Sequence, residues 1–165
     1  MAYPLFGAGQ RVNVAHAGRV STPAGIYNIV RALPAEHGPV QYRIKSDTEA
    51  FERLAKMIFI RLQAANDSAD LNDLRNFTTP ELFASLRLDL QDRGDATQHT
   101  DVVKVEAKLI NFAQEAAQQI VSVRFTGLVR EEAGAEATPF DEVWHLVKPL
   151  DGSQEWAIAG IQQTA

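Results

Sequence analysis

Residues 120–163, IVSVRFTGLVREEAGAEATPFDEVWHLVKPLDGSQEWAIAGIQQ, decide the fold because they read as three consecutive strands joined by two turns. Apolar and polar residues alternate over residues 121–129, the period-two pattern of a half-buried strand. Residues 131–138 are small and polar, as in a hairpin loop, and residues 140–147 resume the strand pattern. An Asp-Gly pair then marks a turn before a last strand over residues 156–161. The pattern predicts a curved antiparallel sheet with helices on its concave face.

A long helix is predicted before this sheet. Ser46 and Glu49 form a capping box, which marks a helix start, and Asn66-Asp67-Ser68 mark its end. Apolar residues then recur at helical spacing, so that one side of the helix is expected to be buried. These residues are Phe51, Leu54, Ala55, Ile58, Leu62 and Ala65, with Met57 and Phe59 widening the apolar arc.

Two shorter helices and a fourth strand complete this part of the chain. Ser68 or Asp70 is expected to cap a short helix, and Thr79-Pro80-Glu81 marks the start of another, which ends at Gly94. The expected buried stripe of that helix is Leu82, Phe83, Leu86 and Leu90. A strand over residues 102–112 changes parity near Ile110, which predicts a bulge. Helices followed by four antiparallel strands place the fold in the α+β class.

The first part of the chain has a different character. Residues 9–14, 25–31 and 40–45 read as three short strands, which predict a small SH3-like or partial barrel module. We therefore predict two domains, a β module over residues 1–46 and an α+β domain over residues 47–165. Residues 1–46 carry five basic residues and one acidic residue, a net charge of +4. The remaining residues therefore carry a net charge of −9, and the whole chain has −5. The split suggests two partners or simply two charged, solvated surfaces.

The composition excludes several classes of function. The chain has no Cys, so disulfides, thiolate metal sites and thiol nucleophiles are excluded. No apolar run approaches the roughly 20 residues of a membrane-spanning helix, and the N-terminus lacks the pattern of a signal peptide. The sequence therefore predicts a soluble, cytoplasmic protein.

No catalytic constellation stands out. Asp141 and Glu142 precede Trp144, and strand alternation places one of the two carboxylates inward, where burial would raise its pKa and make it a candidate base. The alternative is a strand acid paired with Arg124 or Arg130 across the sheet. His145 is expected to be a hydrogen-bonded sheet residue, and His16, His37 and His99 lie far apart in loops. We therefore predict no catalytic residue, no metal site and no cofactor.

Two binding surfaces remain. An apolar pocket inside the α+β domain would accept a lipid tail, a peptide or a small apolar ligand, unless its side chains fill the core. Its expected lining is Phe51, Met57, Ile58, Phe83, Trp144 and Trp156. In the β module, the basic residues Arg31, Arg43 and Lys45 near Tyr27 and Tyr42 are candidates for contact with RNA or an anionic surface.

Residues 55–94 and 125–163 together resemble the Tim44-like domain of bacterial proteins. The most specific pieces are FIRLQAAND, FTTPELF, PFDEVWHLVKP and WAIAGIQQ. The resemblance implies an NTF2-like cone, in which a bent antiparallel sheet wraps around helices. It also implies a non-enzymatic adaptor that binds protein in membrane-associated translocation or assembly, with peripheral contact at the inner membrane.

A second resemblance concerns residues 25–53, GIYNIVRALPAEHGPVQYRIKSDTEAFER, which are similar to a small, uncharacterised family of bacterial SH3-like proteins. Bacterial Tim44-like proteins usually carry an N-terminal membrane anchor, and here the β module stands in its place. Two alternatives to the adaptor stay open. One is a small-molecule or lipid carrier, or an enzyme, that uses the cone interior, and the other is an RNA- or ribosome-associated protein that acts through the basic module.

Overall fold

The computed structural model describes residues 3–14, 25–34, 38–96, 98–115 and 117–164. The chain divides into two compact units, Met1–Phe51 and Glu52–Ala165. The predicted turns and histidines in residues 15–24 and 35–37, including His16 and His37, lie outside the described residues.

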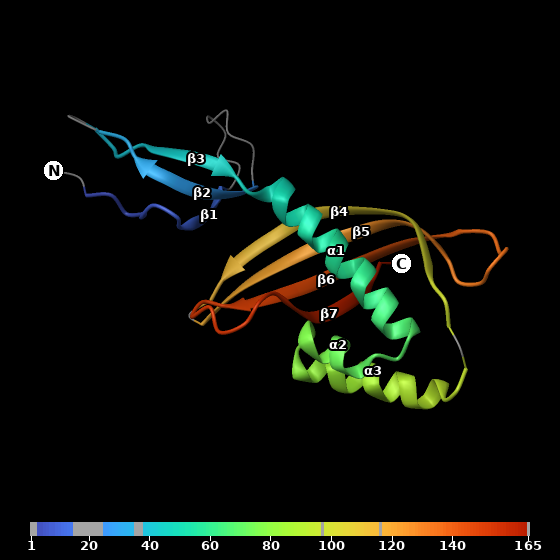
Figure 1. Ribbon diagram of the computed structural model, residues 1–165. Helices are drawn as coiled ribbons and strands as arrows, with labels where there is room; N and C mark the ends of the chain where they lie inside the picture. The colour runs from blue at the N-terminus through green and yellow to red at the C-terminus, as the bar shows by residue number, and fades with distance from the viewer. Residues whose placement is uncertain (1–2, 15–24, 35–37, 97, 116, 165) are drawn as a thin grey trace. The chain divides into compact units, whose positions relative to one another are not determined.

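The first unit contains an antiparallel sheet of three strands, β1 (Arg11–Val14), β2 (Gly25–Ala32) and β3 (Tyr42–Ser46), in the order β1-β2-β3 (Figure 1). The side chains of Tyr27 and Ile29 are buried on one face of this sheet. The three predicted strands are therefore confirmed, while their closure into an SH3-like barrel stays a prediction.

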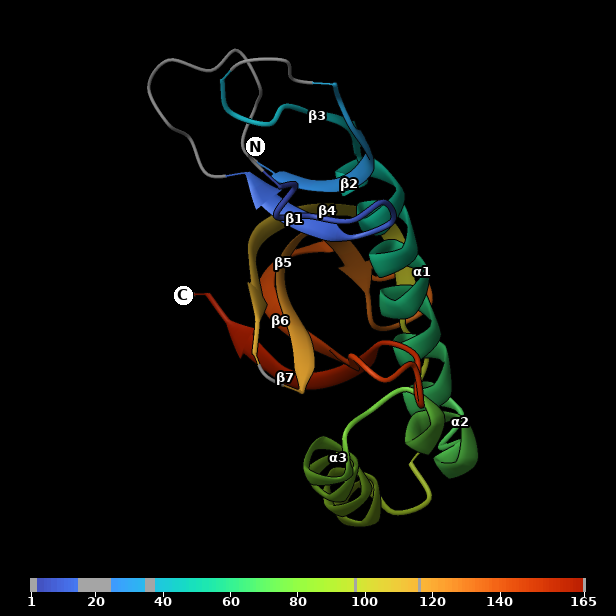
Figure 2. The same cartoon turned by 90° about the vertical axis from the view of Figure 1, so that its left-hand side faces the viewer.

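The second unit has an α+β fold. Its helices and strands are α1 (Thr48–Asp67, of which residues 52–67 belong to this unit), α2 (Leu71–Asn76), α3 (Pro80–Arg93), β4 (Asp101–Gln114), β5 (Gln118–Arg130), β6 (Thr138–Pro149) and β7 (Ala157–Gln163). The strands form one antiparallel sheet in sequence order. Figures 1 and 2 show α1 lying along one face of this curved sheet, with α2 and α3 beyond its β7 edge. The arrangement confirms the α+β prediction and is that of an NTF2-like cone.

An aromatic cluster joins α1 to the sheet. The ring of Phe59 on α1 lies 5.0 Å from that of Phe125, 5.1 Å from that of Phe140 and 4.9 Å from that of Trp144. Phe59, Phe125 and Trp144 are completely or almost completely buried. Aromatic contacts of this kind add to the free energy gained by removing the rings from water. They make Phe59 the central residue of the helix-sheet interface.

Two irregularities bend the edge strand β4. The register between β4 and β5 shifts at Ile110, as the parity change in the sequence predicts, and again at Val103. Opposite the second shift, a Cβ added to Gly127 would lie 1.9 Å from the backbone oxygen of Lys104. Only glycine allows β4 and β5 to approach this closely. The bulges and Gly127 together produce the sheet's curvature at this end.

The predicted helix boundaries are mostly confirmed. Asp70 caps α2 by accepting a hydrogen bond from the backbone N–H of Asp73, and Thr79 caps α3 with Pro80 at its first position. Gly94 ends α3 with a φ of 64°, in the left-handed region that favours glycine. The start of α1 is corrected, because the helix begins at Thr48, so that Asp47 rather than Ser46 precedes its first residue.

Two predicted apolar stripes are wrong in detail. Leu54 was expected to face inward on α1 but is 39% exposed, because the sheet covers a narrower arc of the helix. No residue of α3 is buried, and the expected stripe is half-buried instead: Leu82, Phe83, Leu86 and Leu90. The main partners of α3 are α2 and β7, and the two together leave this stripe partly exposed.

Candidate functional site

A cleft of about 750 Å³ lies where the start of α3 approaches the end of the sheet, and we call it the α3 cleft. Its apolar lining consists of Pro80, Phe83, Val147, Pro149 and Ala157. Val147 and Ala157 are register partners on the sheet face opposite the aromatic cluster. The cleft thus lies between the start of α3 and the apolar end of the outer sheet face.

The N-terminus of α3 is fixed beside this cleft by backbone pairing. The backbone N–H of Thr79 donates to the carbonyl of Ile158 at 2.9 Å, and the N–H of Ile158 donates to the carbonyl of Phe77 at 2.9 Å. Thr78, which is buried, forms a parallel bridge with Ile158, and its hydroxyl donates to the carbonyl of Leu74 at 2.6 Å. The wall formed by α3 is therefore rigid at its beginning, although the helix itself is not buried.

Polar and charged side chains rim the α3 cleft. The guanidinium carbon of Arg75 lies 4.9 Å from the ring centroid of Phe83, a cation–π contact that positions this exposed arginine at the cleft. Asn76, Gln118 and Gln154 contribute amide groups, which both donate and accept hydrogen bonds. The arrangement can hold an extended chain by its backbone while apolar side chains enter between α3 and the sheet.

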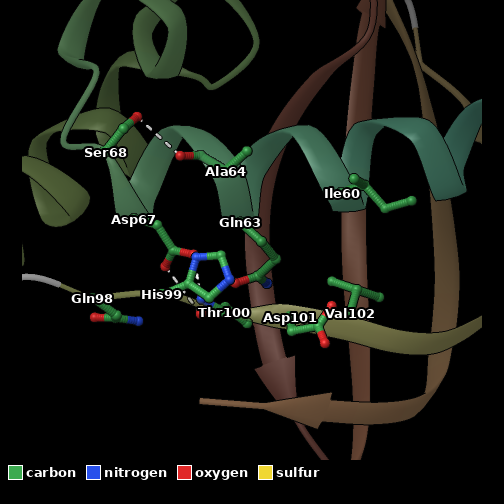
Figure 3. A pocket seen from close by; sticks show the side chains of 10 residues that line it. All are labelled: Ile60, Gln63, Ala64, Asp67, Ser68, Gln98, His99, Thr100, Asp101 and Val102. Atoms are coloured by element: carbon green, nitrogen blue, oxygen red, sulfur yellow. Dashed lines mark hydrogen bonds between the residues drawn. The ribbon is translucent and has the colours of Figure 1, made fainter. Parts of the chain in front are cut away.

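A second cleft, of about 520 Å³, lies between the last turns of α1 and the residues that lead into β4 (Figure 3). Figure 3 shows the ring of His99 beside Gln63 and Asp67, with Ile60 and Val102 at the other end. The Asp67 carboxylate is occupied, because it accepts hydrogen bonds from the backbone N–H and the hydroxyl of Thr100. These bonds fasten the loop before β4 to the end of α1.

The carboxylate of Glu142 lies on the concave face of the sheet, beside Trp144. Its Oε2 accepts a hydrogen bond from Trp144 Nε1 at 2.8 Å, and its Oε1 accepts one from Gln163 Nε2 at 2.7 Å. Strand alternation predicts that one of the two acids, Asp141 or Glu142, points inward. The structure shows that it is Glu142. Both carboxylate oxygens of Glu142 thus already accept hydrogen bonds from neighbouring side chains of the sheet.

Asp141 points to the outer face and forms the cross-strand ion pair that the sequence offered as the alternative. Arg124 on β5 donates to both carboxylate oxygens of Asp141 on β6. Hydrogen bonds from the Arg124 guanidinium, with a further contribution from Thr164, lower the pKa of Asp141 from its usual 3.8 to about 2. Asp141 is thus ionised and paired at neutral pH.

His145 is a hydrogen-bonded sheet residue, as predicted. Its Nδ1 lies 2.8 Å from the hydroxyl oxygen of Ser122, and its Nε2 lies 3.0 Å from Oε1 of Gln162. Within the described residues, no three His, Asp or Glu side chains group in a way that could hold a metal ion. None of the described helices has the length and apolar character that crossing a membrane requires.

The six residues predicted to line one apolar pocket lie in different places. Phe83 lines the α3 cleft, Trp144 and Trp156 are buried in the core, Met57 is 66% exposed, and Ile58 is half-buried. Phe51 is buried at the end of the first unit. The structure thus brings Trp144 to the aromatic cluster around Phe59 and Phe83 to a separate cleft. An apolar pocket lined by all six stays a prediction.

The three predicted basic residues share one face of the first unit. Arg43 and Lys45 alternate with Tyr42 and Ile44 along β3, and Arg31 is the register partner of Arg43. All three cationic side chains are exposed. Tyr27 and Tyr42, which were expected beside them, belong to the opposite face, because Tyr27 pairs with Ser46 and Tyr42 follows the same parity.

Sequence reasoning missed the polar rim of the α3 cleft. Arg75, Gln118 and Gln154 come from three segments that are distant in the chain, and no local pattern relates them. The Thr78-Thr79-Pro80 run indicates that a helix starts here, but it does not indicate that Thr78 pairs with Ile158 of β7.

Comparison with known proteins gives one match. The family model described as the Tim44-like domain matches residues 42–163, about three quarters of the chain. The matched range includes the whole second unit up to Gln163, and with it the α3 cleft. No curated protein and no solved structure matches the chain.

Proposed function

We propose a function from the premise that this chain belongs to the Tim44-like domain family: it is an adaptor that binds a partner polypeptide in the α3 cleft. The family is generally non-enzymatic and is associated with protein translocation at membranes. For this chain, we propose a role in membrane-associated protein translocation or assembly. The observation that carries the proposal is the cleft between α3 and the apolar end of the sheet.

The size and lining of the α3 cleft suit a short polypeptide segment. Its volume of about 750 Å³ falls within the range of roughly 300–1,000 Å³ that is usual for binding clefts. Phe83, Val147 and Ala157 offer apolar surface, and a partner side chain that enters beside them would gain free energy by leaving water. The amides of Asn76 and Gln154 match the donors and acceptors of a peptide backbone.

The charge at the rim favours a partner with an acidic group. Arg75 is the one cationic residue of the lining, and the Phe83 ring holds its guanidinium in place. A fixed guanidinium can bind a carboxylate through two parallel hydrogen bonds. Glu155, the acidic residue of the lining, lies 3.4 Å from Lys148, so its charge is partly compensated. The partner segment that fits is apolar with one carboxylate.

The concave face supports the adaptor over an enzyme or a carrier. Phe59, Phe125 and Trp144 are in mutual contact where a ligand inside the cone would lie. Glu142, the inward carboxylate, is engaged by Trp144 and Gln163. These contacts give the interior a packed core at this place, and they leave the α3 cleft as the better site for a partner.

The proposal is tested with short random peptides displayed on phage and selected on the full chain. Selected peptides are then synthesised, and their binding to the wild type, Ala157→Trp and Ala133→Trp is measured by fluorescence anisotropy. We expect Ala157→Trp to weaken binding by about tenfold or more, because its indole occupies the cleft. Ala133→Trp, on the exposed loop between β5 and β6, introduces the same side chain and should bind like the wild type. Equal binding by both variants would refute the α3 cleft as the site.

The role of Arg75 gives a second readout. Arg75→Glu should lose the peptides that contain a carboxylate and retain those that do not. Equal binding of all selected peptides to Arg75→Glu and to the wild type would exclude a partner with an acidic group. Whether the α3 cleft is the binding site is decided separately, by Ala157→Trp.

A further inference from the structure

One face of the first unit's sheet carries three exposed cations, and the described residues of its strands include no carboxylate to balance them. Arg31 and Arg43 are direct register partners on β2 and β3, and Lys45 follows Arg43 on the same face. Within the part of the chain that the structure describes, none of these three side chains forms an ion pair or a hydrogen bond. Asp47, the first acidic residue after β3, forms an ion pair with Arg11, whose Nε lies 2.9 Å from Oδ2 of Asp47.

The placement of Arg31 opposite Arg43 is unfavourable for the isolated sheet. Side chains of directly opposed residues in an antiparallel pair have Cβ atoms only about 5 Å apart, and like charges at that separation destabilise the pair. A bound anion between the two guanidiniums would convert this repulsion into attraction, since a phosphate group accepts hydrogen bonds from both. The arrangement therefore favours a ligand that carries phosphate.

This face also carries an exposed apolar residue, Val30. The register of β2 shifts between Ile29 and Arg31, which leaves Val30 as the extra residue of a bulge. In such a bulge the two residues opposite a single partner point to the same side, so Val30 accompanies Arg31 and Arg43. Val30 is 45% exposed. An exposed apolar side chain among cations suits the boundary between headgroups and acyl chains.

The same face lacks what single-stranded RNA would need. Proteins bind single-stranded nucleic acid by stacking bases on aromatic rings beside a basic groove. The described aromatic residues of these strands, Tyr27 and Tyr42, belong to the opposite face. Tyr27 is buried, and the Tyr42 hydroxyl accepts the backbone N–H of Leu5 at 2.7 Å while its ring packs on Phe6 at 5.5 Å. Neither ring is available to a base stacked on the cations.

We propose that Arg31, Arg43 and Lys45 form a docking face for an anionic phospholipid surface, so that the first unit supplies the membrane contact of the adaptor. The inference rests on the part of the proposed function that places the adaptor at a membrane, and it is independent of the α3 cleft. Each basic side chain at an anionic bilayer strengthens binding by about fivefold, so three side chains contribute about a hundredfold at low ionic strength.

The test measures sedimentation of the full chain with vesicles. One set of vesicles contains about one part phosphatidylglycerol to two parts phosphatidylcholine, and the other contains phosphatidylcholine alone. The triple variant Arg31→Gln/Arg43→Gln/Lys45→Gln is compared with Arg87→Gln/Lys104→Gln/Lys108→Gln, which removes the same charge from exposed positions of the second unit. We expect the wild type and the second variant to bind the anionic vesicles, and the first variant to bind about a hundredfold more weakly. Equal binding by the two variants, or no binding by the wild type, would overturn the proposal.

Two further measurements make the result specific. The first measurement is binding of a single-stranded oligonucleotide to the wild type. If the oligonucleotide bound under conditions where anionic vesicles do not, the face would be assigned to nucleic acid and the proposal would be overturned. Replacing Arg43 by Gln removes the opposed like charge, so the urea midpoint of Arg43→Gln should equal or exceed that of the wild type. A lower midpoint would mean that Arg43 has a structural partner and would count against the docking face. Peptide binding in the α3 cleft should persist in the triple variant, which separates this proposal from the adaptor function.

Discussion

The ring of Phe59 on α1 lies 5.1 Å from the ring of Phe140 on β6, and the two planes are inclined by 15°. This stacked pair, together with the contacts of Phe59 to Phe125 and Trp144, joins the long helix to the centre of the sheet. Phe59 is 1% exposed, so its large apolar side chain contributes strongly to the free energy that holds α1 on the sheet.

Phe59→Ala should therefore lower the free energy of unfolding by about 3–5 kcal/mol, the usual cost of truncating a buried phenylalanine. The matched control is Met57→Ala, two residues earlier on the same helix, where the side chain is 66% exposed and the cost should stay below about 0.5 kcal/mol. Urea unfolding followed by tryptophan fluorescence measures both. Similar losses for the two variants would contradict the position of Phe59 at the helix-sheet interface.

The contrast between Phe59 and Met57 shows how far the sequence can predict this fold. Helical periodicity identified α1 and its apolar arc, because spacing along one element is local information. Which part of that arc is buried depends on the width of the sheet that covers it, and the strands of this sheet all lie farther along the chain. The same reason explains α3, whose caps were predicted correctly while its stripe was not. Its partner β7 lies far along the chain and covers little of it.

Gly127 marks a second feature that periodicity does not reveal. A Cβ at this position would lie 1.9 Å from the Lys104 backbone oxygen, and backbone cannot move aside as a flexible side chain can. Gly127→Ala should therefore cost at least about 2 kcal/mol in unfolding free energy. At Gly160 on β7, an added Cβ would meet only the His145 ring at 3.7 Å, so Gly160→Ala should be close to neutral. Thermal unfolding followed by circular dichroism distinguishes the two, and equal melting temperatures would mean that the bend tolerates a side chain.

The ion pair of Arg124 and Asp141 predicts a dependence of stability on pH. Because Arg124 lowers the folded-state pKa of Asp141 to about 2, the unfolded state binds more protons at low pH. The pair's stabilisation is fully present above the unfolded pKa near 4 and is lost as the pH falls from about 4 to about 2. Urea midpoints of the wild type and Asp141→Asn, measured from neutral to acid pH, should converge in this window. Arg124→Gln removes the guanidinium that lowers the pKa of Asp141, so this variant should lose the same pH-dependent part of the stability as Asp141→Asn. If the urea midpoint of Arg124→Gln fell between pH 4 and pH 2 as steeply as that of the wild type, a group other than Arg124 would lower the pKa of Asp141.

The candidate site was less predictable than the fold. Phe83 was singled out from its place on a helix stripe, but Arg75, Gln118 and Gln154 join it only through tertiary structure. The basic face was predicted from strand alternation, since Arg43 and Lys45 are two residues apart. The pairing of Arg31 with Arg43 depends on a bulge at Val30 that the sequence does not mark, whereas alternation along β3 alone places Tyr42 on the opposite face.

The hydrogen bonds of His145 predict its tautomer. Oε1 of Gln162 can only accept, so the ring nitrogen facing it, Nε2, must carry a proton. Nδ1 then accepts from the Ser122 hydroxyl at 2.8 Å, and the neutral ring is satisfied on both sides. Long-range ¹H–¹⁵N correlation spectra at neutral pH should show a protonated Nε2 and an unprotonated Nδ1. Ser122→Ala should retain this tautomer, because the bond to Gln162 remains, and should cost about 1 kcal/mol in unfolding free energy for the lost hydrogen bond. A protonated Nδ1 together with an unprotonated Nε2 in the wild type would show that Gln162 presents its amide nitrogen and that Ser122 accepts rather than donates.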